Sequence, residues 1–166
     1  KVVEEVTAAL ESVNFSARPN PTVMRFKYGK LIMNLGNALA AVAPPGDGTK
    51  DIRALMRAEA EACFKAAGID CARQDEEKAR RGDLMKSGSV PGQDRVAGSS
   101  WQSLERGTGN IEADFLNGEI VMLGRLHGVP TPANAVLQRL ANELAANRGE
   151  PQSISLAEVQ RQIAAD

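Results

Sequence analysis

A lysine and two asparagines share one narrow stripe of a helix that is otherwise mostly apolar. Lys30, Asn34 and Asn37 stand at positions i, i+4 and i+7 of the stretch KLIMNLGNALAAV, residues 30–42. At about 100° per residue, this spacing puts the three polar side chains on one side of the helix. The other positions are mainly Leu, Ile, Met, Ala and Val, so we expect a helix buried almost all round. An ammonium group in such a surface costs free energy unless something pairs with it.

The spacing leaves two interpretations of Lys30 open. In the first, the apolar stem packs on the protein and the ammonium group reaches water, which is the commoner arrangement for a lysine on a helix. In the second, the ammonium group lies in a polar cleft beside the two amides and donates a proton to an alkoxide that develops on a substrate. The neighbouring amides of Asn34 and Asn37 give the second interpretation more weight than it would have for an isolated lysine.

The composition sets limits on the class of protein. A chain of 166 residues can bury a sizeable core, and its net charge of −1 gives no reason to expect nucleic acid or an anionic membrane as a partner. No apolar run approaches the roughly 20 residues of a membrane span, and no signal-peptide pattern is present, so we expect a cytoplasmic protein. Cys63 and Cys71 are expected to be reduced thiols. A single histidine, His127, argues against a zinc site built on histidines, and we expect no metal.

Helical periodicity predicts an all-α fold of six to eight helices, with no alternating strand pattern. The predicted helices cover residues 2–13, 21–43, 51–68, 72–86, 101–106 and 110–128, followed by two that begin at Pro132 and after Ser155. The helix at 72–86 should be charged and exposed, and residues 87–100 should form a long loop. Expected caps are Ser99 or Ser100, Asn110, Thr131 and Ser155, the last with Glu158 in a capping box.

Two stretches resemble a known family. KLIMNLGNAL, residues 30–39, and SSWQSLERGTGNIEADFLNGEIVMLGRLHGVPTPAN, residues 99–134, are similar to the C-terminal domain of ketopantoate reductase. The second stretch holds a Ser-Ser pair, then Glu-x-Asp-Phe-Leu-Asn-Gly, then His-Gly-Val-Pro-Thr-Pro-x-Asn. The resemblance covers most of residues 20–145.

The resemblance implies a domain organisation. Residues 20–166 would be a helical substrate-binding domain, like the C-terminal domain of 6-phosphogluconate dehydrogenase-type reductases. Residues 1–19 would be the end of an N-terminal Rossmann domain that binds NADPH. The substrate, a ketopantoate-like 2-oxo acid, would lie between the two domains. The full enzyme would make pantoate for pantothenate and coenzyme A biosynthesis, and the isolated domain would be inactive. The family contains monomers and dimers, so a homodimer stays open.

The resemblance also implies roles for single residues. Lys30 would protonate the ketone oxygen as hydride arrives from the nicotinamide, and Asn34 would hydrogen-bond the substrate. Ser100 would meet the substrate carboxylate, and Glu112 the substrate hydroxyl and the cofactor ribose. Many members carry a second asparagine at the position of Ala38, whereas this chain has Asn37, one residue earlier. We keep Asn37 as a substrate-binding candidate, and its contacts stay open.

Two other functions stay open beside ketopantoate reduction. A reductase of the same family could act on another 2-oxo acid, which the shifted Asn37 and Trp101 allow. A helical interaction module without catalysis is the alternative of a different class. The retention of four motif residues argues against it: Lys30, Asn34, Ser100 and Glu112. For the enzyme, we expect the predicted site residues to converge on one concave surface with residues 87–99 at its edge.

Overall fold

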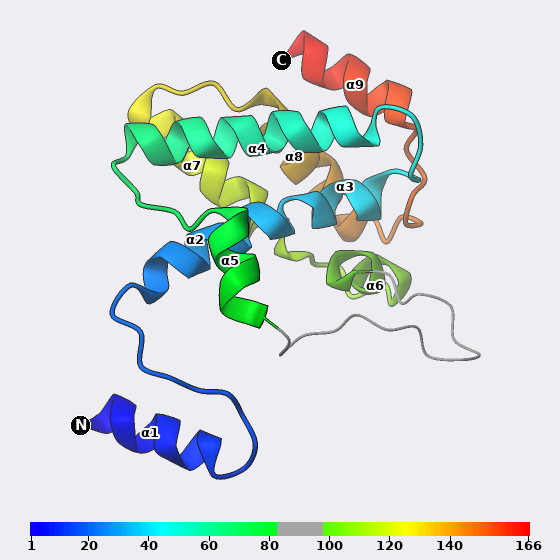
Figure 1. Cartoon of the computed structure of the whole chain (residues 1–166). Coiled ribbons are helices and arrows are strands. Elements are labelled where there is room, and N and C mark those ends of the chain that lie inside the picture. Colours follow the sequence, from blue (N-terminus) through cyan, green and yellow to red (C-terminus); the bar gives the residue numbers. More distant parts are fainter. Residues whose placement is uncertain (83–97) are drawn as a thin grey trace.

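A computed structural model describes residues 1–82 and 98–166 of the chain. All regular secondary structure in these residues is helical, as predicted (Figure 1). The elements are α1 (Val2–Glu11), α2 (Val23–Asn34), α3 (Gly36–Val42), α4 (Thr49–Ala66), α5 (Gln74–Arg81), α6 (Ser99–Glu105), the 3-10 helix η2 (Glu112–Phe115), α7 (Asn117–His127), α8 (Pro132–Ala146) and α9 (Leu156–Ala165). If α2 and α3 are counted as the one helix that the sequence predicts, the α-helices in this part of the chain number eight, within the predicted range.

The core lies where α3, α4, α7 and α8 pack against one another. Its largest fully buried side chains include Leu35, Leu39, Met56, Ile120 and Leu137. Each buried side chain of this size stabilises the fold by about 1.5–3 kcal/mol through removal of apolar surface from water. α6 covers α3, and α9 covers α8. The 3.6-residue spacing of these apolar positions is the reason that the sequence predicts helices here.

The predicted helix over residues 21–43 divides at Leu35. The Leu35 N–H lies 3.1 Å from the carbonyl oxygen of Leu31 and 3.4 Å from that of Ile32, so the turn tightens without leaving helical geometry. α3 is buried along its length, as expected. The same expectation is wrong for α2, whose only buried residues are Gly29 and Ile32. The physical reason is that α2 extends out of the body and packs mainly on the short α5 (Figure 1).

The predicted helix over residues 110–128 also divides. Asn110 does not cap it, because residues 112–115 form the 3-10 helix η2 and α7 begins only at Asn117. The side chain of Asp114 explains the interruption, since it accepts hydrogen bonds from Gln138 Nε2 (2.8 Å) and Asn142 Nδ2 (2.6 Å) of α8. These bonds hold η2 against α8 instead of continuing the axis of α7. The predicted end at Gly128 is confirmed, with the glycine at φ 68°.

The expected helix caps have mixed outcomes. Ser155 accepts a hydrogen bond from the main-chain N–H of Glu158 at 3.2 Å, which confirms the cap of α9, although the Glu158 carboxylate pairs with Arg161. Pro132 is the first residue of α8 as predicted, but no side-chain cap bond comes from Thr131. Ser99 and Ser100 lie inside α6, which begins at Ser99, so neither precedes the helix as a cap.

The charged helix predicted after residue 72 is more buried than expected at one position. α5 ends at Arg81, while residues 83–86 of the predicted helix and 87–97 of the predicted loop lie outside the described residues. Most of α5 is exposed, but Glu77 is 4% exposed and faces α2. Its carboxylate pairs with Arg80 and Arg81 on its own helix. The prediction of an exposed helix is therefore wrong at this position.

α1 stands apart from the body of the protein (Figure 1). None of its residues is buried, although Val2, Val6 and Leu10 form one apolar side with helical spacing. Within the described residues, no helix combines the length and the apolar character that crossing a membrane requires.

Candidate functional site

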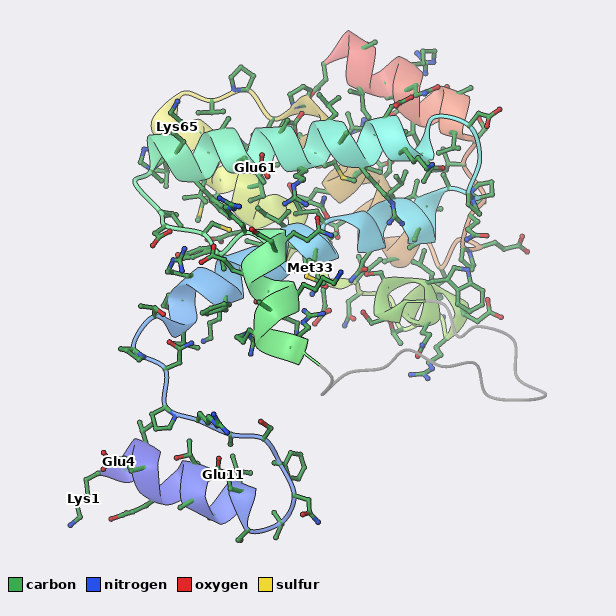
Figure 2. The ribbon with its side chains drawn as sticks, viewed as in Figure 1. Lys1, Glu4, Glu11, Met33, Glu61 and Lys65 are labelled. Atoms are coloured by element: carbon green, nitrogen blue, oxygen red, sulfur yellow. The ribbon has the colours of Figure 1, made fainter. Side chains whose placement is uncertain are left out.

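Lys30 and Asn34 lie one turn apart on α2, near the point where this helix passes into α3. The side chain of Lys30 is exposed and that of Asn34 is half-buried. No ion pair joins the Lys30 ammonium group to any residue that the structure describes. Figure 2 labels Met33 at the same end of α2. The Met33 sulfur lies 3.5 Å from Arg81 Nη2 of α5. Among the described residues, nothing holds the ammonium group away from a ligand.

The first half of α2 is fixed by ion pairs to α5 and to the segment before it. Arg25 Nε lies 2.6 Å from Asp70 Oδ2, and Arg25 Nη1 lies 2.9 Å from Glu76 Oε1. The hydrogen bonds to Glu76 and Asp70 raise the pKa of the Arg25 guanidinium. The main-chain N–H of Arg73 and the Arg25 guanidinium lower the pKa of Glu76. Both shifts favour the charged pair, which holds the helix that carries Lys30.

Asn37 lies beside the start of α6. A Cβ atom placed on Gly98 would be 3.8 Å from Asn37 Oδ1, so the amide lies close to the main chain two residues before Ser100. α6 packs along α3, and the Ser100 side chain is buried. The structure thus brings Asn37 close to the end of α6 that carries Ser100.

Glu112 lies in η2, just before the start of α7, and α7 contacts the same junction. Asn117 Nδ2 donates to the carbonyl oxygen of Leu35, 3.4 Å away, and Leu35 directly follows Asn34. η2 begins at Glu112 and ends two residues before Asn117, so Glu112 is close in sequence to the residue that makes this contact. The Glu112 side chain is exposed and has no hydrogen bond to a described residue, in contrast to Asp114. In a 3-10 helix, residues i and i+3 lie on the same side, so exposed Phe115 lies beside Glu112.

Two contacts bring other elements close to the α2–α3 junction, at which the helix that carries Lys30 and Asn34 ends. The contact near Gly98 joins Asn37 to α6, and the contact of Asn117 with Leu35 joins η2 and α7 to the junction. Chemically, the set offers one ammonium donor, two amides, a hydroxyl and a carboxylate. Such groups suit a small polar substrate that carries a carbonyl and an anionic end.

The sequence interpretation missed a buried polar network behind this junction. The Glu59 carboxylate accepts hydrogen bonds from the main-chain N–H groups of Ala133 (2.8 Å) and Asn134 (3.0 Å), and from Asn134 Nδ2 (2.6 Å). Asn134 Oδ1 accepts from Asn117 Nδ2 at 3.0 Å. Glu59 thus caps the N-terminus of α8 in place of Thr131, where a negative charge is stabilised by the free N–H groups.

The sequence contains a signal for Glu59. Ile52, Met56, Ala60 and Cys63 lie at helical spacing on the buried side of α4, and Glu59 stands among them. A carboxylate on a core-facing stripe needs internal donors. Asn117 and Asn134 stand in the long motif of residues 99–134, but no partner for them could be read from one sequence.

Metal and thiol chemistry find no support in the described residues. No group of three or more His, Cys, Asp and Glu side chains that could hold a metal ion occurs there. Burial raises the pKa of the Cys63 thiol, whose sulfur lies 3.7 Å from the carbonyl oxygen of Ile120. A buried thiol with a raised pKa is a poor nucleophile, so Cys63 is a core residue.

Comparisons with known proteins show the family of this chain. Residues 12–145 match the family model "Ketopantoate reductase PanE/ApbA C terminal". This chain belongs to the ketopantoate reductase family and corresponds to its C-terminal domain. No curated protein matches the chain significantly.

One solved structure with the same fold is a PanE/ApbA family ketopantoate reductase from Ralstonia eutropha JMP134. It is 28% identical with a TM-score of 0.71, and the match covers 87% of this chain. The match covers 49% of the Ralstonia chain, so this chain spans about half the length of that relative.

Proposed function

We propose that this chain is the substrate-binding half of a cytoplasmic, NADPH-dependent reductase that converts a ketopantoate-like 2-oxo acid to its 2-hydroxy acid, as in pantothenate biosynthesis. The observation that supports it most is Lys30 on α2, which is exposed and has no ion pair with a described residue, in a domain that belongs to the ketopantoate reductase family. A proton donor for the ketone oxygen must be open to substrate and held in place. α2 provides both, because its first half is tied by Arg25 while Lys30 is exposed.

In this proposal each candidate group has a separate task. Lys30 Nζ donates the proton to the ketone oxygen while the substrate is bound. Asn34 and Asn37 hydrogen-bond the substrate from the two sides of the α2–α3 junction. Ser100 meets the substrate carboxylate, and Glu112 accepts a hydrogen bond from the substrate hydroxyl. The buried network of Glu59 holds α7 and α8 in place behind them.

The residues of this chain fit only a small part of NADPH. The described residues contain no strand, so they provide no strand–turn–helix cradle for the pyrophosphate. The exposed carboxylate of Glu112 suits a ribose hydroxyl. NADPH supplies the hydride when bound, and we propose that a Rossmann domain working with this chain holds it. The Ralstonia relative, twice as long as the matched region, supports a second domain.

The apolar side of α1 also supports a second domain. Val2, Val6 and Leu10 are exposed on one side of a helix that has no buried residue. Exposed apolar stripes of this kind are normally covered by another protein surface. We propose that residues 1–19 pack against the Rossmann domain.

A reductase for another 2-oxo acid is the second candidate. The observation that favours it is the position of Asn37, which lies against Gly98 and so approaches the site from α3. A helix turns about 100° per residue, so this amide cannot take the direction of one at position 38. Substrate contacts on this side therefore differ from those of many family members.

The test is an assay of the chain in its complete reading frame. NADPH consumption is measured with ketopantoate and with smaller and larger 2-oxo acids, for the wild type and for Lys30→Ala. Turnover that is highest with ketopantoate supports the proposal, and a preference for another 2-oxo acid supports the second candidate. If no 2-oxo acid is reduced, the enzyme proposal is wrong and the interaction module is favoured.

A further inference from the structure

A hollow of about 580 Å³ lies outside the candidate site, beside the C-terminal end of α6. Its walls come from residues 101–107 and from residues 148–152 in the connection between α8 and α9, which passes close to α6 in Figure 1. None of the five predicted site residues lines it. Its volume is within the range of about 300–1,000 Å³ that is usual for small-molecule sites.

One part of the hollow is apolar. Trp101, Leu104 and Pro151 line it, and Leu104 is 5% exposed. Trp101 is half-buried and packs against the core. Because Trp101 is the only tryptophan of the chain, it also reports any ligand that enters. The hollow therefore has a fixed apolar surface for part of a ligand.

The wall formed by residues 148–152 is anchored to the main chain of α3. The Gln152 N–H donates to the carbonyl oxygen of Ala41 at 2.7 Å, and Gln152 Nε2 donates to that of Ala40 at 3.1 Å. The Ile154 N–H donates to the carbonyl oxygen of Val42 at 3.1 Å. These bonds satisfy the free carbonyl groups at the end of α3. The wall is thus preformed, and a ligand need not order it.

Four charged side chains surround the opening: Glu105, Arg106, Arg148 and Glu150. None forms an ion pair with a described residue. Arg106 Nη2 donates to Gln102 Oε1 at 3.3 Å, whereas the Arg148 guanidinium has no partner among the described residues. By contrast, the guanidinium of Arg139 on α8 is bound by both Glu143 and Gln162.

We propose that this hollow binds a small zwitterion with an apolar side chain, of the class of the α-amino acids. The two arginines and two glutamates sum to zero charge, so a simple anion or a simple cation gains little from the site as a whole. A molecule that carries a carboxylate and an ammonium group can pair with both kinds of side chain, and its apolar part can lie on Trp101 and Leu104. The proposal does not rest on the reductase function.

The experiment titrates the 166-residue chain with the non-aromatic L-α-amino acids and follows Trp101 fluorescence, with calorimetry as the second readout. At least one apolar amino acid is expected to bind with a Kd of about 1 mM or tighter. Its N-acetyl derivative lacks the ammonium group, and its amide lacks the carboxylate. Each should bind about tenfold more weakly or worse. If no amino acid of the panel binds, or if the N-acetyl derivative binds as well as its parent, the proposal is wrong.

Variants test the position of the site. Arg148→Ala and Glu150→Ala should each weaken binding about tenfold, while circular dichroism shows an unchanged fold because both side chains are exposed. Arg139→Ala, which removes an arginine already paired with Glu143, should leave the affinity unchanged. Unchanged affinity in both Arg148→Ala and Glu150→Ala would overturn the assignment.

Discussion

Asn134 Nδ2 donates a hydrogen bond of 2.6 Å to the carboxylate of Glu59 in the middle of the protein. The same asparagine accepts from Asn117, and Asn117 donates to the main chain at Leu35. One buried series of hydrogen bonds therefore joins α4, α8 and α7 to the junction of α2 and α3. Since the predicted site residues lie on elements around this junction, we expect their arrangement to depend on the buried carboxylate of Glu59.

Glu59→Gln should destabilise the fold by about 1–3 kcal/mol, the usual effect of leaving a buried polar group unsatisfied. The amide keeps the size of the side chain, but its NH₂ group replaces one carboxylate oxygen. That group cannot accept a hydrogen bond, so the N–H of either Ala133 or Asn134 loses its acceptor. The midpoint of urea unfolding measures the change. Glu61→Gln on the same helix is the control, because its exposed pair with Arg57 contributes about 0.5 kcal/mol or less. Equal effects of the two substitutions would contradict the role of Glu59.

The helices could be predicted because their apolar residues recur at helical spacing, as in α4 and α8. Their interruptions could not, because each depends on a distant contact. η2 leaves the axis of α7 where Asp114 bonds to Gln138 and Asn142, which lie 24 and 28 residues away. α2 is more exposed than its sequence suggests because α5, which packs on it, is short. Periodicity reports which side of a helix is apolar, and it does not report how much of that side finds a partner.

Glu112→Gln and Asp114→Asn form a matched pair within η2. Glu112 is exposed and unpaired among the described residues, so Glu112→Gln should leave stability within about 0.5 kcal/mol of the wild type. In the complete enzyme it should weaken both substrate binding and turnover. Asp114→Asn should instead lower stability, because the carboxylate accepts from both Gln138 and Asn142. Thermal unfolding and steady-state kinetics separate the two effects, and a stability loss confined to Glu112→Gln would reverse the assignment.

The 166-residue chain alone should fold but should not bind NADPH tightly. Its core from α3, α4, α7 and α8 is complete in the described residues, whereas a strand-linked phosphate cradle is absent from them. Circular dichroism tests the first expectation, and a fluorescence titration with NADPH tests the second. A sub-micromolar Kd for NADPH would show that this chain holds the cofactor by itself.

Acid should weaken helix α9 itself, because the partners of the Glu158 carboxylate lie on the same helix. Hydrogen bonds from Arg161 and Gln162 lower the pKa of Glu158 from 4.5 to about 2. Because the folded-state pKa is depressed, this contribution to stability is fully present above about pH 4.5 and is lost as the pH falls towards 2. The difference in unfolding temperature between the wild type and Glu158→Gln should therefore shrink over that interval. A constant difference would mean that the ion pair does not stabilise α9.

The candidate site could be predicted in part, since the motifs name residues but not distances. Lys30 and Asn34 share a helix, so their relation follows from their spacing. The approach of Asn37 to Gly98, and of Asn117 to Leu35, joins segments 61 and 82 residues apart, and one sequence carries no signal for such contacts. The sequence also predicts nothing about the hollow beside Trp101, because its two walls lie on segments that only the fold brings together.

Lys30→Ala in the complete enzyme should lower kcat by about 10²-fold or more, the usual loss when a positioned general acid is removed. The unfolding midpoint should stay unchanged, because the side chain is exposed and its removal opens no cavity in the core. Lys65→Ala is the control. Lys65 is also an exposed lysine near the end of a helix, but it lies at the C-terminal end of α4 and apart from Met33, which marks the end of α2 (Figure 2). Steady-state kinetics should show no change for Lys65→Ala. If Lys30→Ala has the same kcat as the wild type, Lys30 is not the proton donor. Its stem then only packs on the protein while the ammonium group reaches water, which is the first of the two interpretations of the sequence.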